Sequence, residues 1–199
     1  MDKRDEVSYY PELADCIERI IKSNISSPHI VIKALYLPEY GNNIRSYLDY
    51  YIKTSERNVS RALAEYAKDV PKIRTDIIVL ADNPRQNKFV ITILEVKLLG
   101  SMGLSELSQL IGYGLVAKTK YGVLVNINGG ISSDLRKILL TDKDITNIKR
   151  KLEQSPFEQT YKTGVMSYNP NTKALDYIET LSGITIPKLA GLIEGELLN

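Results

Sequence analysis

The chain has very little cysteine, histidine or tryptophan. Its 199 residues include one cysteine, Cys16, one histidine, His29, and no tryptophan. A single cysteine excludes an internal disulfide framework and a cysteine-ligated zinc or iron–sulfur centre within one chain. A single histidine argues against a histidine-rich metal site or a histidine-driven triad. Any chemistry must therefore be carried by carboxylates and lysines.

Long apolar runs and a strong excess of one charge are also missing. No apolar stretch approaches the roughly 18 residues of a membrane helix, and no hydrophobic region follows the charged residues 1–6. We therefore expect an intracellular, soluble protein of the cytoplasm, without a membrane partner. The formal net charge is +2, which permits a local nucleic-acid-binding patch without requiring one.

The hydrophobic pattern predicts alternating helices and strands in one domain. In chain order, the expected elements are a helix over 8–23, a strand over 29–37, a turn over 38–43, helical structure over 44–69, strands over 73–81 and 88–98 that form a hairpin, a helix over 103–118, a strand over 121–127, helices over 131–140 and 143–154, a hairpin over 164–178 and a short helix after Pro187. This order predicts an α/β fold with a central mixed β-sheet flanked by helices. We expect a single domain over 1–199, with a helical insertion at about 42–70 and a C-terminal elaboration at about 131–199.

Three charged residues stand at the predicted hairpin. Asp76 opens its first strand, and Glu95 and Lys97 interrupt the apolar second strand. Residues two apart on a strand share a face, about 6–7 Å from each other, and Asp76 can lie beside them. Adjacent carboxylates stay ionised near neutral pH only with a cation between them. Oxygen ligands favour Mg²⁺ or Mn²⁺, and a neighbouring lysine can hold or deprotonate an attacking water.

A structural ion pair is the alternative explanation for this motif. Burying Glu95 and Lys97 in an apolar strand costs free energy unless they form an ion pair or take part in binding or catalysis. A second pattern favours a functional role, because Gln109 and Tyr113 stand four apart on the following helix and share a face. That face lies opposite the apolar stripe of this helix, where plain surface residues would also be found.

Residues 72–127 resemble the core of PD-(D/E)xK nucleases, in particular the RecB-like and lambda-exonuclease-like branch. Arg74-Thr75-Asp76 is similar to the Gly-Arg-x-Asp element of this branch, Glu95-Val96-Lys97 to its E-x-K motif, and Gln109-x-x-x-Tyr113 to its helical Q-x-x-x-Y motif. The chain departs from the pattern in having no glycine before Arg74. It also lacks the four-cysteine cluster of the iron–sulfur-bearing relatives.

The resemblance implies a restriction-endonuclease-like αβββαβ core and a Mg²⁺-dependent deoxyribonuclease, a phosphodiester hydrolase. DNA would be its partner, and the catalytic set would be the five motif residues Asp76, Glu95, Lys97, Gln109 and Tyr113. Small nucleases of this type often use a second copy to reach two strands, so a homodimer is expected. The competing function is a non-catalytic DNA-binding or assembly protein that retains the nuclease fold. An unrelated α/β protein would instead hold Glu95 and Lys97 remote from Asp76.

The family usually adds an acidic metal ligand from the first helix. Glu6 is our choice beside Asp76 and Glu95, because it continues the Tyr10–Leu13–Ile17 face by one turn. Glu12 is the alternative. Glu56 or Glu65 would take the role if residues 44–69 supplied the equivalent helix.

Two groups of basic residues are candidates for phosphate contacts. Arg85 and Lys88 flank the hairpin loop, which we expect beside the site. The run of residues 149–151, Lys-Arg-Lys, falls in a predicted helix, where a solvated face is the favoured interpretation over a DNA contact.

Overall fold

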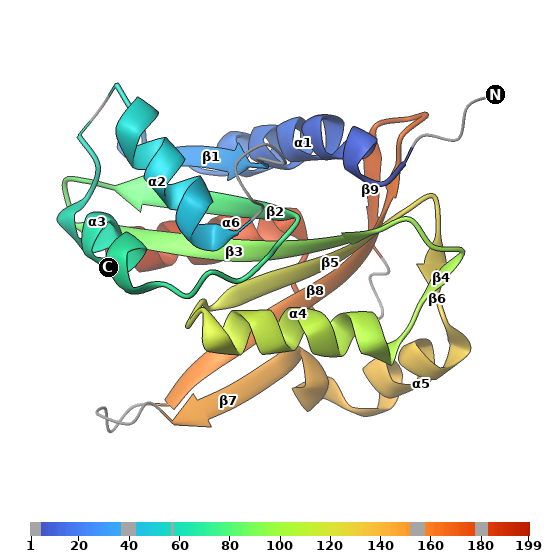
Figure 1. Ribbon diagram of the computed structural model, residues 1–199. Helices are drawn as coiled ribbons and strands as arrows, with labels where there is room; N and C mark the ends of the chain where they lie inside the picture. Colours follow the sequence, from blue (N-terminus) through green and yellow to red (C-terminus); the bar gives the residue numbers. More distant parts are fainter. Residues whose placement is uncertain (1–4, 37–42, 57, 152–157, 178–182) are drawn as a thin grey trace.

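The computed structural model describes residues 5–36, 43–56, 58–151, 158–177 and 183–199. Its elements, labelled in Figure 1, are η1 (Val7–Tyr9), α1 (Tyr10–Ser23), β1 (Val31–Leu35), α2 (Ile44–Thr54), α3 (Arg61–Asp69), β2 (Ile77–Asn83), β3 (Lys88–Lys97), β4 (Ser101–Met102), α4 (Leu104–Val116), β5 (Tyr121–Ile127), β6 (Gly130–Ile131), α5 (Ser133–Thr141), η3 (Lys143–Thr146), β7 (Asn147–Lys151), β8 (Glu158–Asn169), β9 (Ala174–Tyr177) and α6 (Ile186–Leu198).

A mixed sheet runs through the middle of the molecule. Its strand order is β1-β2-β3-β5-β8-β7, and β9 also pairs with β8. The β1–β2, β2–β3, β7–β8 and β8–β9 pairs are antiparallel, whereas β3–β5 and β5–β8 are parallel. Parallel neighbours need a crossover, and α4 provides it between β3 and β5. The predicted α/β fold with a central mixed sheet and flanking helices is confirmed.

Helices cover both faces of this sheet, and each face has its own apolar cluster. In β2, Ile77 and Val79 pack with α1 and α6, whereas Ile78 and Leu80 pack with the helices α2 to α5. This alternation follows from the two-residue period of a strand. Because both faces are covered, β2 is buried at every position, as a continuous apolar run predicts.

The helical structure expected over 44–69 consists of two helices between β1 and β2. Asn43 and Ser60 are the N-caps of α2 and α3, and their side chains accept hydrogen bonds from the backbone N–H groups of Ser46 and Leu63. Both helices pack on the sheet through buried residues, such as Leu48 of α2 and Leu63 of α3. None of the helices in the described ranges combines the length and apolar character that a membrane span requires.

The helix predicted over 143–154 is wrong. Residues 143–146 form a short 3-10 helix, and Asn147–Lys151 is a strand that pairs antiparallel with β8. Pairing with β8 satisfies backbone groups along this segment and overrides its local pattern. Among the described strands β7 pairs only with β8, so the run 149–151 lies on an edge strand. Most of the predicted turn, 38–42, lies outside the described residues.

Candidate active site

The predicted cluster lies where β3 extends beyond β2. The two strands pair from Asn83↔Lys88 to Ile77↔Leu94, and β3 then continues along β5 as far as Lys97↔Asn126. Asp76 directly precedes β2, so it lies next to Glu95 at the edge that β2 leaves open. Leu94 and Val96 face the α1 and α6 layer. Glu95 and Lys97 therefore project from the opposite face, toward the layer that contains α4.

The charged groups of the three motif residues converge. Lys97 Nζ donates to Glu95 Oε1 at 2.5 Å and lies 4.0 Å from Asp76 Oδ2. Asp76 Oδ2 also accepts a hydrogen bond of 2.8 Å from the backbone N–H of Val96. The fixed amide and the lysine thus hold both carboxylates around one point at the end of β3.

Glu6 completes the cluster from the segment before α1. Its Oε2 accepts a hydrogen bond of 3.0 Å from the N–H of Leu98, and its Oε1 accepts one of 2.9 Å from the hydroxyl of Tyr10. Val96 and Leu98 are two apart, so their N–H groups point to the same open edge of β3. Figure 1 shows the start of α1 and the end of β3 at the same end of the sheet. Asp76 and Glu6 therefore occupy the positions that a longer β2 would fill.

The alternative acids lie elsewhere. The charge of Glu12 acts on Tyr168 of β8, and Glu65 pairs with Arg61 on the exposed side of α3. Glu56 follows α2 and lines a separate cleft. Among the four candidates, Glu6 is the acid that the structure brings to Lys97 and Glu95, whose pKa values its charge raises.

Burial and crowding of negative charge set the electrostatics of the cluster. Glu95 is 2% exposed. Burial, with the charges of Asp76 and Glu6, raises its pKa to about 7, although Lys97 acts in the opposite direction. The pKa of Lys97 is raised as well, because the three carboxylates outweigh its burial. Burial and the charges of Asp76 and Glu6 raise the pKa of Tyr10 far above its ordinary value.

Gln109 and Tyr113 are hydrogen-bonded to each other. Gln109 is exposed, and its Nε2 donates to the Tyr113 hydroxyl at 2.8 Å. Within the described ranges neither side chain is hydrogen-bonded to Asp76, Glu95 or Lys97. The helical Q-x-x-x-Y pattern is thus present as a hydrogen-bonded pair on α4.

Glu106 is the α4 residue that sequence reasoning missed. Its Oε2 accepts a hydrogen bond of 2.7 Å from the N–H of Gly103, and its Oε1 accepts one from the Ser105 hydroxyl. These bonds and, more weakly, the positive charge of Lys97 lower the pKa of Glu106. An acid in the first turn of a helix that follows the E-x-K strand is the only sequence signal, and a capping role explains it equally well.

The expectation that Arg85 and Lys88 lie beside the site is wrong. They flank the tight turn at Asn83↔Lys88, whereas the acids lie beyond Ile77↔Leu94, at the other end of both strands. At about 3.3 Å per residue, the seven residues of β2 separate the two ends by roughly 20 Å. Arg85 Nη1 instead lies 2.8 Å from Nε2 of His29.

The donor chemistry of the cluster fits a hard divalent cation. Asp76, Glu95 and Glu6 offer oxygen atoms only. Burial and, after it, the negative charges of Asp76 and Glu6 raise the pKa of Glu95, and a bound cation would offset these charges. Lys97 Nζ donates a hydrogen bond to Glu95 Oε1, one of these oxygen atoms. In the part of the chain that the structure describes, no group of three or more acidic, histidine or cysteine side chains is already arranged around a metal position. Binding would therefore require Lys97 to move away from Glu95.

No family model matches the chain, and neither a curated protein nor a solved structure matches it. Function must therefore be inferred from the geometry of the cluster.

Proposed function

We propose that this chain is a Mg²⁺- or Mn²⁺-dependent deoxyribonuclease that hydrolyses phosphodiester bonds. One observation carries the proposal. At the open end of β3, the carboxylates of Asp76 and Glu95 both lie within 4.0 Å of the ammonium nitrogen of Lys97. The order α1, β1, β2, β3, α4, β5, with α2 and α3 inserted, supports it, because the αβββαβ core of the PD-(D/E)xK family has this order.

The residues of the cluster have different roles in this proposal. Asp76, Glu95 and Glu6 would hold the cation. Backbone hydrogen bonds fix the carboxylates of Asp76 and Glu6 in advance, and burial fixes that of Glu95. A bound Mg²⁺ polarises the phosphodiester and lowers the pKa of an attacking water. Lys97, once displaced from Glu95, would hold that water or offset the charge that develops on the phosphate. Glu106 lies close enough for the charge of Lys97 to contribute to its lowered pKa.

The proposal extends to DNA as the substrate and to a homodimer in the cytoplasm. A second copy would bring a second site to the opposite strand. Light scattering in solution would test the oligomeric state separately.

The direct test is incubation with linear, circular and branched DNA in the presence of Mg²⁺, Mn²⁺ or EDTA. We expect cleavage with either metal and none with EDTA. Asp76→Asn should lower the rate at least about 100-fold, because it removes a charged ligand. Asp49→Asn, on the exposed side of α2, is the matched control and should cleave like the wild type. Cleavage that persists in EDTA, or an active Asp76→Asn protein, would exclude the proposed site.

A further inference from the structure

The hydroxyl of Tyr10 contacts two of the acids in the cluster. It donates to Glu6 Oε1 at 2.9 Å, and it is also hydrogen-bonded to the side chain of Asp76. Tyr10 is the first residue of α1 and is 3% exposed. Its ring belongs to the apolar cluster that α1 and α6 cover. Close packing of that cluster therefore fixes the place of the hydroxyl.

The chain before α1 brings Glu6 to this hydroxyl. Glu6 lies four residues before Tyr10 and has helical backbone angles, so the two side chains share a face. The 3-10 turn of η1 is closed by a hydrogen bond of 3.2 Å from the N–H of Tyr9 to the C=O of Glu6. Asp5 accepts two further hydrogen bonds from Ser8, one from its N–H and one from its hydroxyl. Local hydrogen bonds thus hold Glu6 in place.

A second tyrosine holds the backbone of Asp76. Asp76 lies one residue before the paired part of β2. The hydroxyl of Tyr47, a fully buried residue of α2, contacts the C=O groups of Thr75 and Asp76 at 3.0 and 3.1 Å. The N–H of Val96 donates to Asp76 Oδ2. Asp76 is therefore held at its backbone from α2 and at its carboxylate from β3 and α1.

Burial of Tyr10 does not by itself require two carboxylates at its hydroxyl. A buried tyrosine hydroxyl needs one partner, and Glu6 provides it. The hydroxyl has a single hydrogen and no charge, so it cannot neutralise a second acid. The charges of Glu6, Asp76 and Glu95 all act on one ammonium group, that of Lys97. An excess of negative charge therefore gathers around fixed oxygen atoms, which is the setting that favours a hard cation.

We propose that Tyr10 is a positioning residue of the cation site, which holds the carboxylates of Glu6 and Asp76 in the arrangement that binds Mg²⁺ or Mn²⁺. This inference rests on the proposed function, because it concerns the same site. A carboxylate has two oxygen atoms with several lone pairs, so a hydrogen bond to the hydroxyl leaves room for the cation. Hydrogen bonds to metal ligands orient them, and removing such a bond typically lowers metal affinity roughly 10- to 100-fold.

The test is Tyr10→Phe, which keeps the ring and removes the hydroxyl. Mn²⁺ binding to the folded full chain is measured by titration calorimetry, so the stability of the fold does not enter the result. We expect the dissociation constant for Mn²⁺ to rise about tenfold. Tyr10 acts through the two carboxylates, so its effect on cleavage should follow the metal. The variant should need about tenfold more Mn²⁺ for half-maximal cleavage, and at saturating Mn²⁺ its rate should be within about threefold of the wild type.

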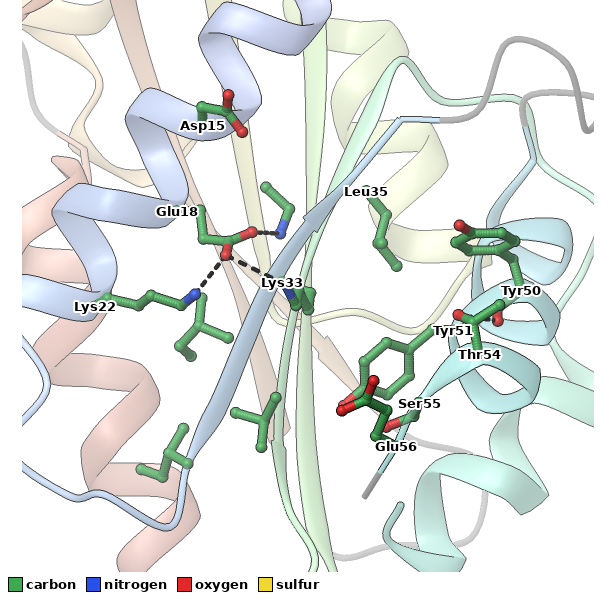
Figure 2. Close-up of a pocket in the computed structure, with 14 residues that line it drawn as sticks. Asp15, Glu18, Lys22, Lys33, Leu35, Tyr50, Tyr51, Thr54, Ser55 and Glu56 are labelled. Atoms are coloured by element: carbon green, nitrogen blue, oxygen red, sulfur yellow. Dashed lines mark hydrogen bonds and ion pairs between the residues drawn. The ribbon is translucent and has the colours of Figure 1, made fainter. Parts of the chain in front are cut away.

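Two control variants separate this role from general effects. Tyr168→Phe removes another buried hydroxyl from the same apolar cluster, one without a hydrogen-bond partner among the described residues. Asp15→Asn removes a negative charge from the exposed side of α1, where Asp15 lines a separate cleft (Figure 2). Both variants should bind Mn²⁺ like the wild type.

Three results would overturn the inference. An unchanged or lower dissociation constant in Tyr10→Phe, with or without a lower melting temperature in EDTA, would leave Tyr10 with a packing role. An equal loss of affinity in Tyr168→Phe would assign the effect to the removal of any buried hydroxyl from this cluster. A wild-type chain that binds no Mn²⁺ would remove the metal site and with it the proposed function, which the first two results leave intact.

Discussion

At the scale of single residues, Glu95 links the stability of the fold to pH. Its pKa is about 7 in the folded chain against an ordinary value of 4.5, so folding favours the protonated acid. The contribution of Glu95 to the free energy of unfolding is therefore fully present below pH 4.5 and is lost as pH rises through 7. Its size is about 3 kcal/mol, since each pKa unit corresponds to about 1.4 kcal/mol.

The first prediction follows from this linkage. In EDTA, the free energy of unfolding of the wild type should fall between pH 4.5 and 7 more steeply than that of Glu95→Gln, which cannot ionise. At pH 7 the variant should be the more stable protein, by up to about 3 kcal/mol. Urea unfolding across this pH range measures both quantities. A variant with the same pH slope as the wild type would show that Glu95 is ionised without cost.

The second prediction concerns which acid from the N-terminal segment completes the site. Glu6→Gln should weaken Mn²⁺ binding about tenfold, because it removes one negative charge from the cluster. Glu12→Gln, its control from α1, should bind Mn²⁺ like the wild type, since Glu12 acts on Tyr168 instead. The Mn²⁺-dependent rise in melting temperature reports the affinity. Equal affinities in the two variants would remove Glu6 from the metal site.

At the scale of elements, the parts of the site that follow from strand geometry could be predicted from the sequence. The period of two places Glu95 and Lys97 together, and the hairpin brings Asp76 to them. Glu106 could not be predicted, because its place near Lys97 depends on how α4 packs across the sheet. The strand at 147–151 could not be predicted from its own pattern, because pairing with β8, the next strand along the chain, decides its conformation.

The position of Arg85 and Lys88 is a different kind of error. The sequence already placed them at the turn of the hairpin and the acids at its open end. Antiparallel pairing alone therefore separates them by the length of the strands. That Gln109 is hydrogen-bonded to Tyr113 and not to the acids, in contrast, is a matter of side-chain placement, which sequence spacing leaves open.

The third prediction compares two glycines of α4. A methyl group at Gly114 would overlap the ring of Tyr161, which is fully buried and also abuts Gly122, so the ring cannot move aside. A methyl group at Gly112 meets nothing within 4 Å. Gly114→Ala should therefore lower the free energy of unfolding by at least about 2 kcal/mol, and Gly112→Ala should raise it by up to about 1 kcal/mol. Thermal melts distinguish the two, and a Gly114→Ala protein as stable as the wild type would contradict this packing.

At the scale of the whole molecule, three accounts of the cluster remain distinct. In the enzyme account, Lys97 acts on the water or phosphate in the transition state. In a DNA-binding account without catalysis, Lys97 is one phosphate contact among several. In a purely structural account, its 2.5 Å ion pair with Glu95 only stabilises the end of β3. Each account assigns the lysine a different measurable effect.

Lys97→Ala tests the enzyme account most directly, with Lys53→Ala from the exposed side of α2 as its control. Cleavage, DNA affinity across salt concentrations and melting temperature are measured on both proteins. We expect the Lys97 variant to cleave at least about 100-fold more slowly while its DNA affinity changes less than about threefold. A binding role would instead weaken affinity and reduce the salt slope by about one, and a structural role would lower only the melting temperature. An unchanged cleavage rate would contradict the proposed mechanism.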